Sequence, residues 1–535
     1  MLFVTLLSSV LSPYQTCSLI GAPTRFEGIG VILCYILVML YTFFIIENAQ
    51  DVKYLFYSLG LLLIFQTFIG LFQFIGYDPL SFKGIREIVS PGEFANQYYF
   101  TSGKEPFALY TGFGNWTGTL GNKNYSGSLV SLTFPIFLIL TLFTPSKLQR
   151  CLGIFLCMAI FFITFACKSQ GGQVGIFIAL LIAIILFSKS LPTLWQKVKF
   201  LTLKESIYIG FYTLFFTSYM ISVIYFTKGT GEIKHMFYSI GDYIGITQIS
   251  PSSSTHAPYD LKDFILNPYK IEILTKDNKL QITFINSHIS FTDKINHTVS
   301  TIQESPDTYR LDSKAFYPYL FQILPQKEHT FIFLMTGSID NPKKHLAFTM
   351  SPSGELNILN PITLKPIAIE EPPTLGFKNH ESLGSSRGYI WSRTLPLLKQ
   401  YFLIGGGPDT FIFAFPQNDF LGKWQFMNNP FITVDKPHNT YLQIWVNQGF
   451  IALAIFLSIN LIYLLQSLKL SGFKKVYTLS EGVGIALMLG ITGYLVTSFF
   501  NDTTLSVTPL YYSLLGAGMA YNRIYSLKPF TFSKS

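Results

Sequence analysis

The sequence predicts a polytopic α-helical membrane protein of about 10 transmembrane helices, with a large extracytoplasmic loop that contains a small β-rich domain and an amphipathic helix. Hydrophobic residues make up 49% of the 535 residues and charged residues only 13%, whereas about a quarter of a soluble domain is charged. The mean hydropathy is +0.39. Uncharged stretches also recur that reach the roughly 20 residues a helix needs to cross the hydrocarbon core.

Nine of these stretches are predicted to be spans: Gly28–Ile46, Tyr54–Gly76, Tyr125–Pro145, Cys151–Cys167, Ser169–Ser188, Ser206–Thr227, Asn439–Leu468, Gly482–Asn501 and Thr503–Asn522. The tenth candidate is Met1–Thr24, which has no charge before Arg25 but is interrupted by Pro13. Because it lacks the basic start of a signal peptide, we interpret it as an anchored, shortened first span.

The positions of Lys and Arg predict the orientation, because these residues resist translocation in short loops. With the N-terminus inside, thirteen of them fall in predicted inner loops and the C-terminus, and six in short outer loops. Both termini are therefore expected in the cytoplasm, with the chain in the inner or plasma membrane. The predicted parts are an N-terminal membrane domain 1–227 of about seven spans, an extracytoplasmic region 228–438 and a C-terminal membrane domain 439–535 of about three spans.

The extracytoplasmic region changes character along its length. From about 259 to 372, short runs of β-branched and aromatic residues alternate with turn residues, which predicts a small β-rich domain. From about 385 to 410, apolar residues at helical spacing alternate with Arg387 and Arg393, and a glycine turn follows. This pattern is typical of an amphipathic helix at a membrane surface, kinked at Pro396.

Composition also excludes several classes of function. An extracytoplasmic site has no access to ATP or nucleotide sugars. A nucleic-acid partner is not expected, since no basic run with interleaved aromatics occurs, and the net charge of +9 follows mainly from the inner loops. The five cysteines lie in or at the ends of apolar stretches without a CxxC pair, and the carboxylates Asp409, Asp419, Asp435 and Asp502 are scattered. We expect no disulfide framework, no metal site and no cofactor.

Four short motifs carry a family resemblance. They are Gly121-Asn122-Lys123-Asn124, Arg387-Gly388-Tyr389-Ile390-Trp391, Gly405-Gly406-Gly407-Pro408-Asp409-Thr410-Phe411 and His438-Asn439-Thr440-Tyr441-Leu442. In this order they resemble the O-antigen ligase and polymerase superfamily, bacterial polytopic membrane glycosyltransferases that use polyprenyl-pyrophosphate-linked glycans. One motif departs from the family: where many members have Ser-Arg-Gly, this chain has Ser169-Gln170-Gly171. Lys168 stands nearby, but an ammonium lacks the bidentate fork of a guanidinium.

The resemblance implies a metal-independent inverting transfer from a polyprenyl-pyrophosphate-linked oligosaccharide to a glycan, lipid or protein acceptor at the outer face of the bilayer. The implied active site is an outward-facing cavity beneath the 385–400 helix. The implied catalytic residues are His438, as general base, and Arg387, at the departing pyrophosphate. Further contacts to donor pyrophosphate or glycan are implied for Arg25, Lys168, Gln170, Asn122, Asn124, Arg393 and Asn439.

Most of these residues also have a plainer interpretation. His438 would simply cap the helix that follows it, and Asp435 would either orient His438 or be an ordinary loop carboxylate. The arginines Arg387 and Arg393 would anchor the chain to lipid headgroups through their stems. Arg25 would pair only with nearby Glu27. Asn122 and Asn124 would cap the span that they precede.

Other functions stay open at this point. Polymerase and ligase share all four motifs. A transporter or flippase of lipid-linked glycans is the main rival, because polar Asn447-Gln448-Gly449 interrupts a long span, although the chain shows no internal repeat. A non-catalytic assembly protein that docks through its β-rich domain is a third possibility. Replacing His438 discriminates among them, since neither transport nor docking requires a proton acceptor there.

Overall fold

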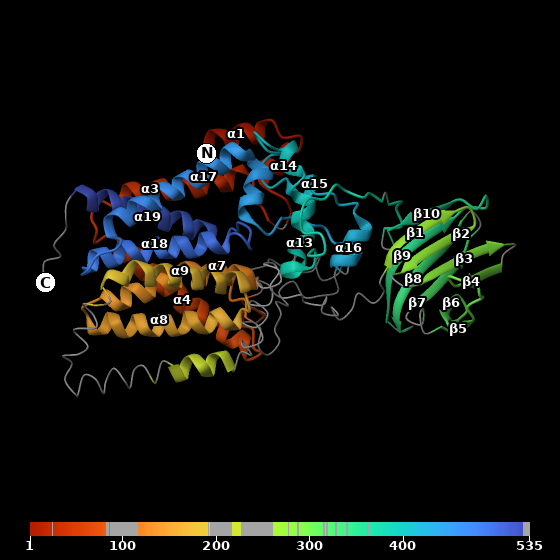
Figure 1. Ribbon diagram of the computed structural model, residues 1–535, viewed down its shortest axis with the longest axis horizontal. Coiled ribbons are helices and arrows are strands. Elements are labelled where there is room, and N and C mark those ends of the chain that lie inside the picture. The colour runs from red at the N-terminus through yellow and green to blue at the C-terminus, as the bar shows by residue number, and fades with distance from the viewer. Residues whose placement is uncertain are drawn as a thin grey trace. The chain divides into compact units, whose positions relative to one another are not determined.

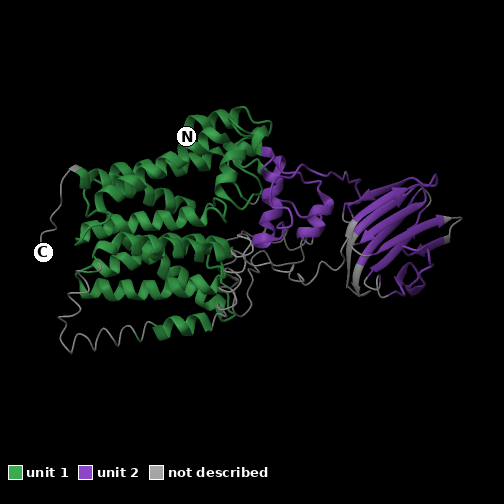
Figure 2. Cartoon of the chain, in the orientation of Figure 1, with its two compact units in different colours: residues 1–240, 398–411, 436–535 green, residues 241–397, 412–435 purple. Residues whose placement is uncertain are grey.

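The structure is a computed structural model in which the chain forms two compact units (Figure 2). It describes residues 1–23, 25–81, 85, 116–190, 192, 214, 217–225, 261–275, 278–285, 288–313, 316, 319–326, 329–338, 341–360, 363–367, 369–427 and 429–527. Unit 1 consists of residues 1–240, 398–411 and 436–535, and unit 2 of residues 241–397 and 412–435. Each unit is therefore assembled from segments that are distant in sequence.

Unit 1 is a bundle of helices (Figure 1). In chain order these are α1 (Leu2–Val10), α2 (Gln15–Ile20), α3 (Ile29–Ile45), α4 (Val52–Phe74), η1 (Pro79–Ser81), α7 (Lys123–Phe143), α8 (Lys147–Ala166), α9 (Gln170–Phe187), η2 (Ser188–Ser190), α17 (Thr440–Ser471), α18 (Leu479–Thr497) and α19 (Thr508–Leu527). Helix α18 lies in the middle, in contact with α7, α9, α17 and α19. One continuous apolar core joins the longer of these helices.

Six helices in the described part of the chain are long and apolar enough to cross a membrane: Val52–Phe74, Lys123–Phe143, Lys147–Ala166, Gln170–Ser190, Thr440–Ser471 and Leu479–Thr497. These confirm the class, a multi-pass helical membrane protein. Helix α3 has 17 residues, fewer than the roughly 20 that a perpendicular span needs. The predicted span Ser206–Thr227 lies largely outside the described residues, and the count of ten stays a prediction.

The first segment differs from the single shortened span that the sequence predicts. Residues before the Arg25 loop form two short helices, α1 and α2, on either side of Pro13. Nine residues of α1 extend about 14 Å, which is less than half of the hydrocarbon core. Two serines hold this segment inside the unit: Ser8 Oγ of α1 donates to the Asn447 carbonyl at 2.8 Å, and Ser12 Oγ, just after α1, donates to the Gly406 carbonyl at 2.6 Å.

Unit 2 contains two antiparallel sheets (Figure 1). The four-stranded sheet has the order β1-β2-β3-β4, formed by Leu261–Asn267, Lys270–Thr275, Lys279–Ile285 and His288–Thr292. The six-stranded sheet has the order β10-β9-β8-β7-β6-β5. Its strands in chain order are β5 (Thr301–Ser305), β6 (Thr308–Leu311), β7 (Tyr319–Pro325), β8 (Thr330–Ser338), β9 (Asn341–Met350) and β10 (Leu356–Leu359). These strands confirm that this part of the chain is β-rich.

The two sheets share one apolar core. Residues with β propensity point into it from both: Ile273 and Ile282 from the smaller sheet, and Phe321 and Phe348 from the larger. In the larger sheet Phe321 of β7 stands opposite Leu334 of β8, so one register aligns the core residues of both strands. Burial of each of these side chains stabilises the folded state by about 1.5–3 kcal/mol.

Four short helices complete unit 2 and its junctions: α13 (Leu383–Thr394), α14 (Leu397–Gln400), α15 (Phe411–Ala414) and α16 (Phe420–Met427). The sequence predicts one helix from 385 to 400, kinked at Pro396. The structure has two helices, α13 and α14, because proline has no N–H for the helix and its ring clashes with the preceding turn. Gly384, Ser385 and Ser386 have left-handed φ of 61°, 59° and 69°, so regular helix begins at Arg387.

Candidate functional site

The His438 turn, residues 436–439, leads into α17. Asn439, and not His438, caps this helix: its Oδ1 accepts the N–H groups of Tyr441 at 2.9 Å and Leu442 at 3.0 Å. His438 has a φ of 51°, a left-handed conformation that non-glycine residues seldom adopt and that costs about 1–3 kcal/mol. The imidazole is therefore free of the capping role considered from the sequence.

His438 is paired with Asp502, which lies in the turn between α18 and α19. Its Nδ1 is 2.7 Å from Asp502 Oδ2, and the side chains are 36% and 4% exposed respectively. Burial alone would raise the pKa of Asp502, but His438, Lys436 and Arg25 outweigh it and hold that pKa below its ordinary value. An ionised carboxylate accepts only, so Nδ1–H donates to it, and in the neutral form of His438 Nε2 is the acceptor.

Asp502 was not among the residues predicted for the site. Asp435 was the candidate for orienting His438, and Asp502 was one of several scattered acids, but the Nδ1 position is taken by Asp502. A signal was present in the sequence. Asp502 is the single residue between the predicted spans Gly482–Asn501 and Thr503–Asn522, on the same predicted side of the membrane as His438.

The neighbouring Asn501 holds the ends of two helices together. Its Nδ2 donates to the Asn124 carbonyl and to Ser128 Oγ, both at 2.9 Å, and its carbonyl accepts Thr440 N at 3.0 Å and Thr440 Oγ1 at 2.8 Å. The starts of α7 and α17 therefore meet beside Asp502. Asn122 caps α7 through Asn124 N at 2.8 Å, as its plainer interpretation predicts; substrate contacts of Asn122, Asn124 and Asn439 stay predictions.

Lys168 and Gln170 lie at the turn between α8 and α9. Lys168 has a φ of 53°, and Ser169 caps α9 through Gly172 N at 3.5 Å. Thr497 Oγ1, at the end of α18, donates to the Gly171 carbonyl at 3.2 Å. This contact brings the start of α9 to the helix end that leads into the Asp502 turn. The role of Lys168 and Gln170 toward a donor is a prediction.

The Arg25 loop, residues 21–28, joins α2 to α3. Arg25 Nη1 donates to the hydroxyl of Tyr125 at the start of α7. The plainer interpretation, a local pair between Arg25 and Glu27, is not what forms, because Glu27 makes an ion pair with Lys436 of the His438 turn. The guanidinium is thus brought to the same end of the bundle as Asp502, whose pKa it helps to lower.

The ion pair of Glu27 and Lys436 is almost completely buried, with side chains 4% and 2% exposed. Lys436 Nζ also donates to the Thr503 carbonyl at 3.2 Å, and Glu27 accepts the hydroxyls of Tyr35 at 2.9 Å and Thr503 at 3.0 Å. Burial would lower the pKa of Lys436, but Glu27, Asp502 and Asp409 outweigh it and the pKa is raised. Lys436 is therefore a permanent cation inside the protein.

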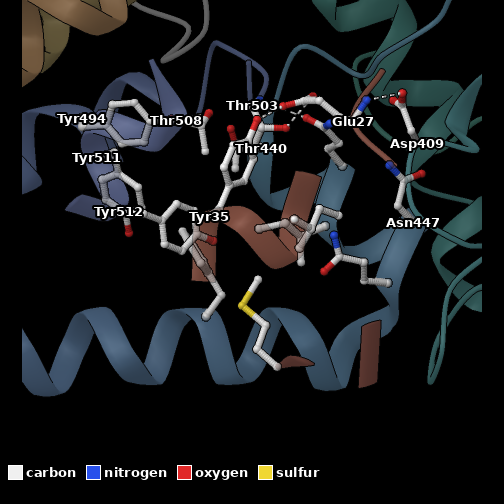
Figure 3. Close-up of a pocket in the computed structure, with 16 residues that line it drawn as sticks. Glu27, Tyr35, Asp409, Thr440, Asn447, Tyr494, Thr503, Thr508, Tyr511 and Tyr512 are labelled. Atoms are coloured by element: carbon white, nitrogen blue, oxygen red, sulfur yellow. Dashed lines mark hydrogen bonds between the residues drawn. The ribbon is translucent and has the colours of Figure 1, made fainter. Parts of the chain in front are cut away.

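A small cavity lies beside this pair (Figure 3). The space open to the centre of a water molecule in it is about 30 Å³, enough for roughly two waters. Glu27 and Asp409 face it from one side and a group of tyrosines from the other, as Figure 3 shows. Asn447 Oδ1 is buried here without a hydrogen-bond partner in the structure. The cavity is too small to hold a sugar.

The glycine turn supports the start of α17. Gly449 has φ 86° and ψ 167° and interrupts this helix, which leaves carbonyls without helical partners. Gly406 N donates to the Val446 carbonyl at 2.9 Å and Gly407 N to the Asn447 carbonyl at 2.8 Å. A Cβ on Gly405 would lie 2.5 Å from the Asn447 backbone. The polar interruption Asn447-Gln448-Gly449, on which the transporter alternative rested, is therefore next to the backbone that the glycine turn binds.

Arg387, of the Arg387–Trp391 motif, and the nearby Arg393 belong to unit 2. Arg387 Nη1 donates to the Gly384 carbonyl at 2.6 Å. Arg393 Nε donates to Asp419 at 2.9 Å, and its guanidinium lies 4.4 Å from the ring centre of Tyr389. This geometry favours a structural role for Arg393 over phosphate binding. The joint site that the sequence predicts for Arg387 and His438 stays a prediction, because His438 belongs to unit 1.

The apolar helices define a multi-pass membrane protein, and the pair of His438 and Asp502 lies in the turns that precede α17 and α19. Comparison with known families then identifies the segment that carries the last three of the four motifs: residues 331–457 match the family described as O-Antigen ligase. The predicted resemblance to the O-antigen ligase and polymerase superfamily is thereby confirmed for this segment, which includes Arg387, the glycine turn and His438. No curated protein and no solved structure matches the chain.

The match supports a coarse function, a membrane enzyme that transfers glycan as a ligase or polymerase, acting on lipid-linked glycans within the bilayer and serving envelope biogenesis. It covers about a quarter of the chain. Several features of the site lie outside it, among them Arg25, the start of α7 and Asp502. Their place beside His438 comes from the fold of unit 1 alone.

Proposed function

We propose that the protein is a metal-independent, inverting glycosyltransferase that takes glycan from a polyprenyl-pyrophosphate donor at the outer face of the cytoplasmic membrane. His438 is the general base, and Asp502 orients it. The observation that carries this proposal is the contact of 2.7 Å between His438 Nδ1 and Asp502 Oδ2, with the imidazole 36% exposed. It leaves Nε2 as a proton acceptor that an incoming hydroxyl can reach.

The transfer is a single displacement. The acceptor hydroxyl attacks the anomeric carbon while the bond from that carbon to the pyrophosphate oxygen breaks, and the electron pair leaves with the polyprenyl pyrophosphate. The hydroxyl proton passes to His438 Nε2 and then to solvent. Attack opposite to the leaving group inverts the anomeric centre. Such a base contributes about 10²–10⁴-fold to the rate.

The donor pyrophosphate accumulates negative charge as it departs, and the cations near His438 stabilise that charge. Arg25 shares the end of the bundle with Asp502, and Lys168 lies at the turn before α9. The starts of α7, α9 and α17 meet around Asn501 and Thr497, and helix N-termini favour anions. A contact of Arg387 with the donor pyrophosphate stays a prediction from the sequence. A good leaving group held by these cations needs no metal.

The test is mass analysis of the products that the purified protein forms from a polyprenyl-pyrophosphate oligosaccharide as sole substrate. Lipid-linked multimers establish a polymerase, and a donor consumed only when a second lipid, glycan or protein acceptor is added establishes a ligase. In either case His438→Ala is expected to lower kcat by about 10²–10⁴-fold.

His297→Ala is the matched control, since His297 lies exposed in unit 2, and it should transfer glycan at the wild-type rate. A donor that stays unchanged with every acceptor class, but crosses a vesicle membrane, would replace this proposal by transport. Full activity of His438→Ala would leave a transferase without this base.

A further inference from the structure

Glu27 and Lys436 have no direct use in the reaction proposed above. Lys436 is 2% exposed, and its ammonium is bound to Glu27 and to the Thr503 carbonyl. Both oxygens of Glu27 are also occupied, Oε1 by Tyr35 and Oε2 by Lys436 and Thr503. Neither group can therefore reach a substrate. Burial of such a pair usually adds little to the free energy of folding, because desolvation offsets the attraction.

The position of the pair in the chain is more informative than its energy. Glu27 follows Arg25 by two residues, Lys436 precedes His438 by two, and Thr503 follows Asp502 directly. The contact joins residues 409 positions apart in sequence. One buried cluster thus fixes the backbone next to a candidate phosphate ligand, next to the base and next to the carboxylate that orients the base.

Asp409, from the glycine turn, closes the Arg25 loop. Its Oδ2 accepts Ala22 N at 2.7 Å and Glu27 N at 3.1 Å. Both ends of the loop are therefore hydrogen-bonded to one oxygen. Phe26, Asp409 and His438 all have left-handed φ, at 56°, 57° and 51°. Such conformations persist only where surrounding contacts impose them, and the carboxylate of Asp409 and the pair of Glu27 and Lys436 are among the contacts beside these residues.

We propose that Glu27 and Lys436, with Asp409 behind them, are positioning residues that set Arg25 and the His438 turn in one register, so that donor pyrophosphate and acceptor hydroxyl are held at the correct separation. This inference rests on the proposed function. A well-packed apolar pair would stabilise the fold as well, but it would not fix the direction of two backbone segments as a hydrogen-bonded ion pair does.

The test compares single and double substitutions in the full-length protein. Lys436→Met and Glu27→Gln each leave one partner alone, so both are expected to lower the melting temperature as well as activity. The double variant Glu27→Gln/Lys436→Met removes both charges together and regains most of the thermal stability. Its kcat is nevertheless expected to stay about 10²-fold low, the effect of a misplacement near 1 Å, with the donor KM close to that of the wild type.

The control is Lys474→Met, which removes the partner of Glu481 at 2.5 Å in a more exposed ion pair of unit 1, and it should leave kcat unchanged. A readout independent of turnover accompanies these assays: the rate at which diethyl pyrocarbonate modifies His438, followed by peptide mass spectrometry with His297 as internal reference. The double variant should change the rate at His438 alone.

Wild-type kcat in the double variant, or an unchanged modification rate at His438, would show that the pair only stabilises the fold. Absence of glycan transfer by the wild-type protein itself would instead remove the proposed function. In that case the modification rate still decides whether Glu27 and Lys436 position His438.

Discussion

Two buried carboxylates of this protein, Asp419 in unit 2 and Asp502 in unit 1, have opposite surroundings. Asp419 accepts Tyr389 OH and Arg393 Nε, both at 2.9 Å, and Gly422 N at 3.0 Å, so both its oxygens are used. Asp502 binds His438 with one oxygen, while Oδ1 is buried without a partner in the structure.

The difference separates a network in which both carboxylate oxygens are paired from one that keeps an unpaired oxygen and a partly exposed imidazole. Arg393 is 10% exposed and stacked on Tyr389, which leaves the Asp419 network closed. The Asp502 network ends in an imidazole that is 36% exposed, next to a strained backbone at His438. A fully satisfied polar network rigidifies a core, whereas an incomplete one is costly and calls for a functional explanation.

The largest expected effect follows from replacing these two carboxylates by amides. Asp502→Asn should lower kcat by about 10²–10⁴-fold, because the amide no longer fixes the tautomer of His438 or stabilises its charged form. Its melting temperature should stay near that of the wild type. Asp419→Asn should instead destabilise the protein by about 3–5 kcal/mol, since it leaves the buried Arg393 guanidinium unpaired.

Transfer assays and thermal unfolding of the two variants side by side check this contrast. The distinction between closed and open networks fails if Asp419→Asn lowers kcat of the folded protein as strongly as Asp502→Asn does.

A second prediction concerns the backbone that supports the open network. Gly449→Ala should destabilise unit 1 by several kcal/mol, because the new Cβ would lie 2.1 Å from the Leu403 carbonyl at a φ of 86°. Gly30→Ala is the control, since nothing lies within 4 Å of a Cβ there and the residue is in helix α3. It should be neutral or stabilise by up to about 1 kcal/mol. Thermal unfolding of both variants measures the difference.

A pH-dependent prediction for the closed network concerns Lys423, whose ammonium donates to the Gln417 carbonyl at 2.7 Å. Burial lowers the pKa of Lys423 from 10.5 to about 8, against the opposing effect of Asp419. Between these two values the unfolded chain binds a proton that the folded chain has released. The stability contributed by this residue therefore rises with pH across that window, by at most about 3 kcal/mol.

Melting temperatures of wild type and Lys423→Met, compared at pH 7.5 and at intervals up to about pH 10.5, isolate this contribution. A gap between the two proteins that stays constant with pH would mean that Lys423 keeps its ordinary pKa.

The smallest effect distinguishes the two roles of Asn439. Asn439→Ala removes the cap of α17 and should cost about 1 kcal/mol, whereas Asn439→Asp keeps a capping oxygen and should cost little. If Asn439 serves only as a cap, Asn439→Asp retains wild-type donor KM. A raised KM in that variant, with its melting temperature unchanged, would assign Asn439 a contact with the donor as well, because the added charge repels pyrophosphate.

Much of the site followed from the sequence, and the part that did not has a clear cause. The motif around His438, the glycine turn and the cap of α7 were all indicated by short local patterns. The partner of Glu27 was predicted as its neighbour Arg25, and the partner of His438 as Asp435 in one interpretation. Both expected partners are close in sequence, whereas the partners in the structure are distant in sequence.

The sequence by itself determined that this protein is a multi-pass helical membrane protein with a β-rich insertion, because apolar length and residue alternation are local properties. It also indicated the superfamily, since the motifs keep their order along the chain. Only the tertiary structure decided that His438 pairs with Asp502 and Lys436 with Glu27. These contacts join residues 64 and 409 positions apart, and only the packing of α17, α18 and α3 in one bundle brings such positions within hydrogen-bond distance.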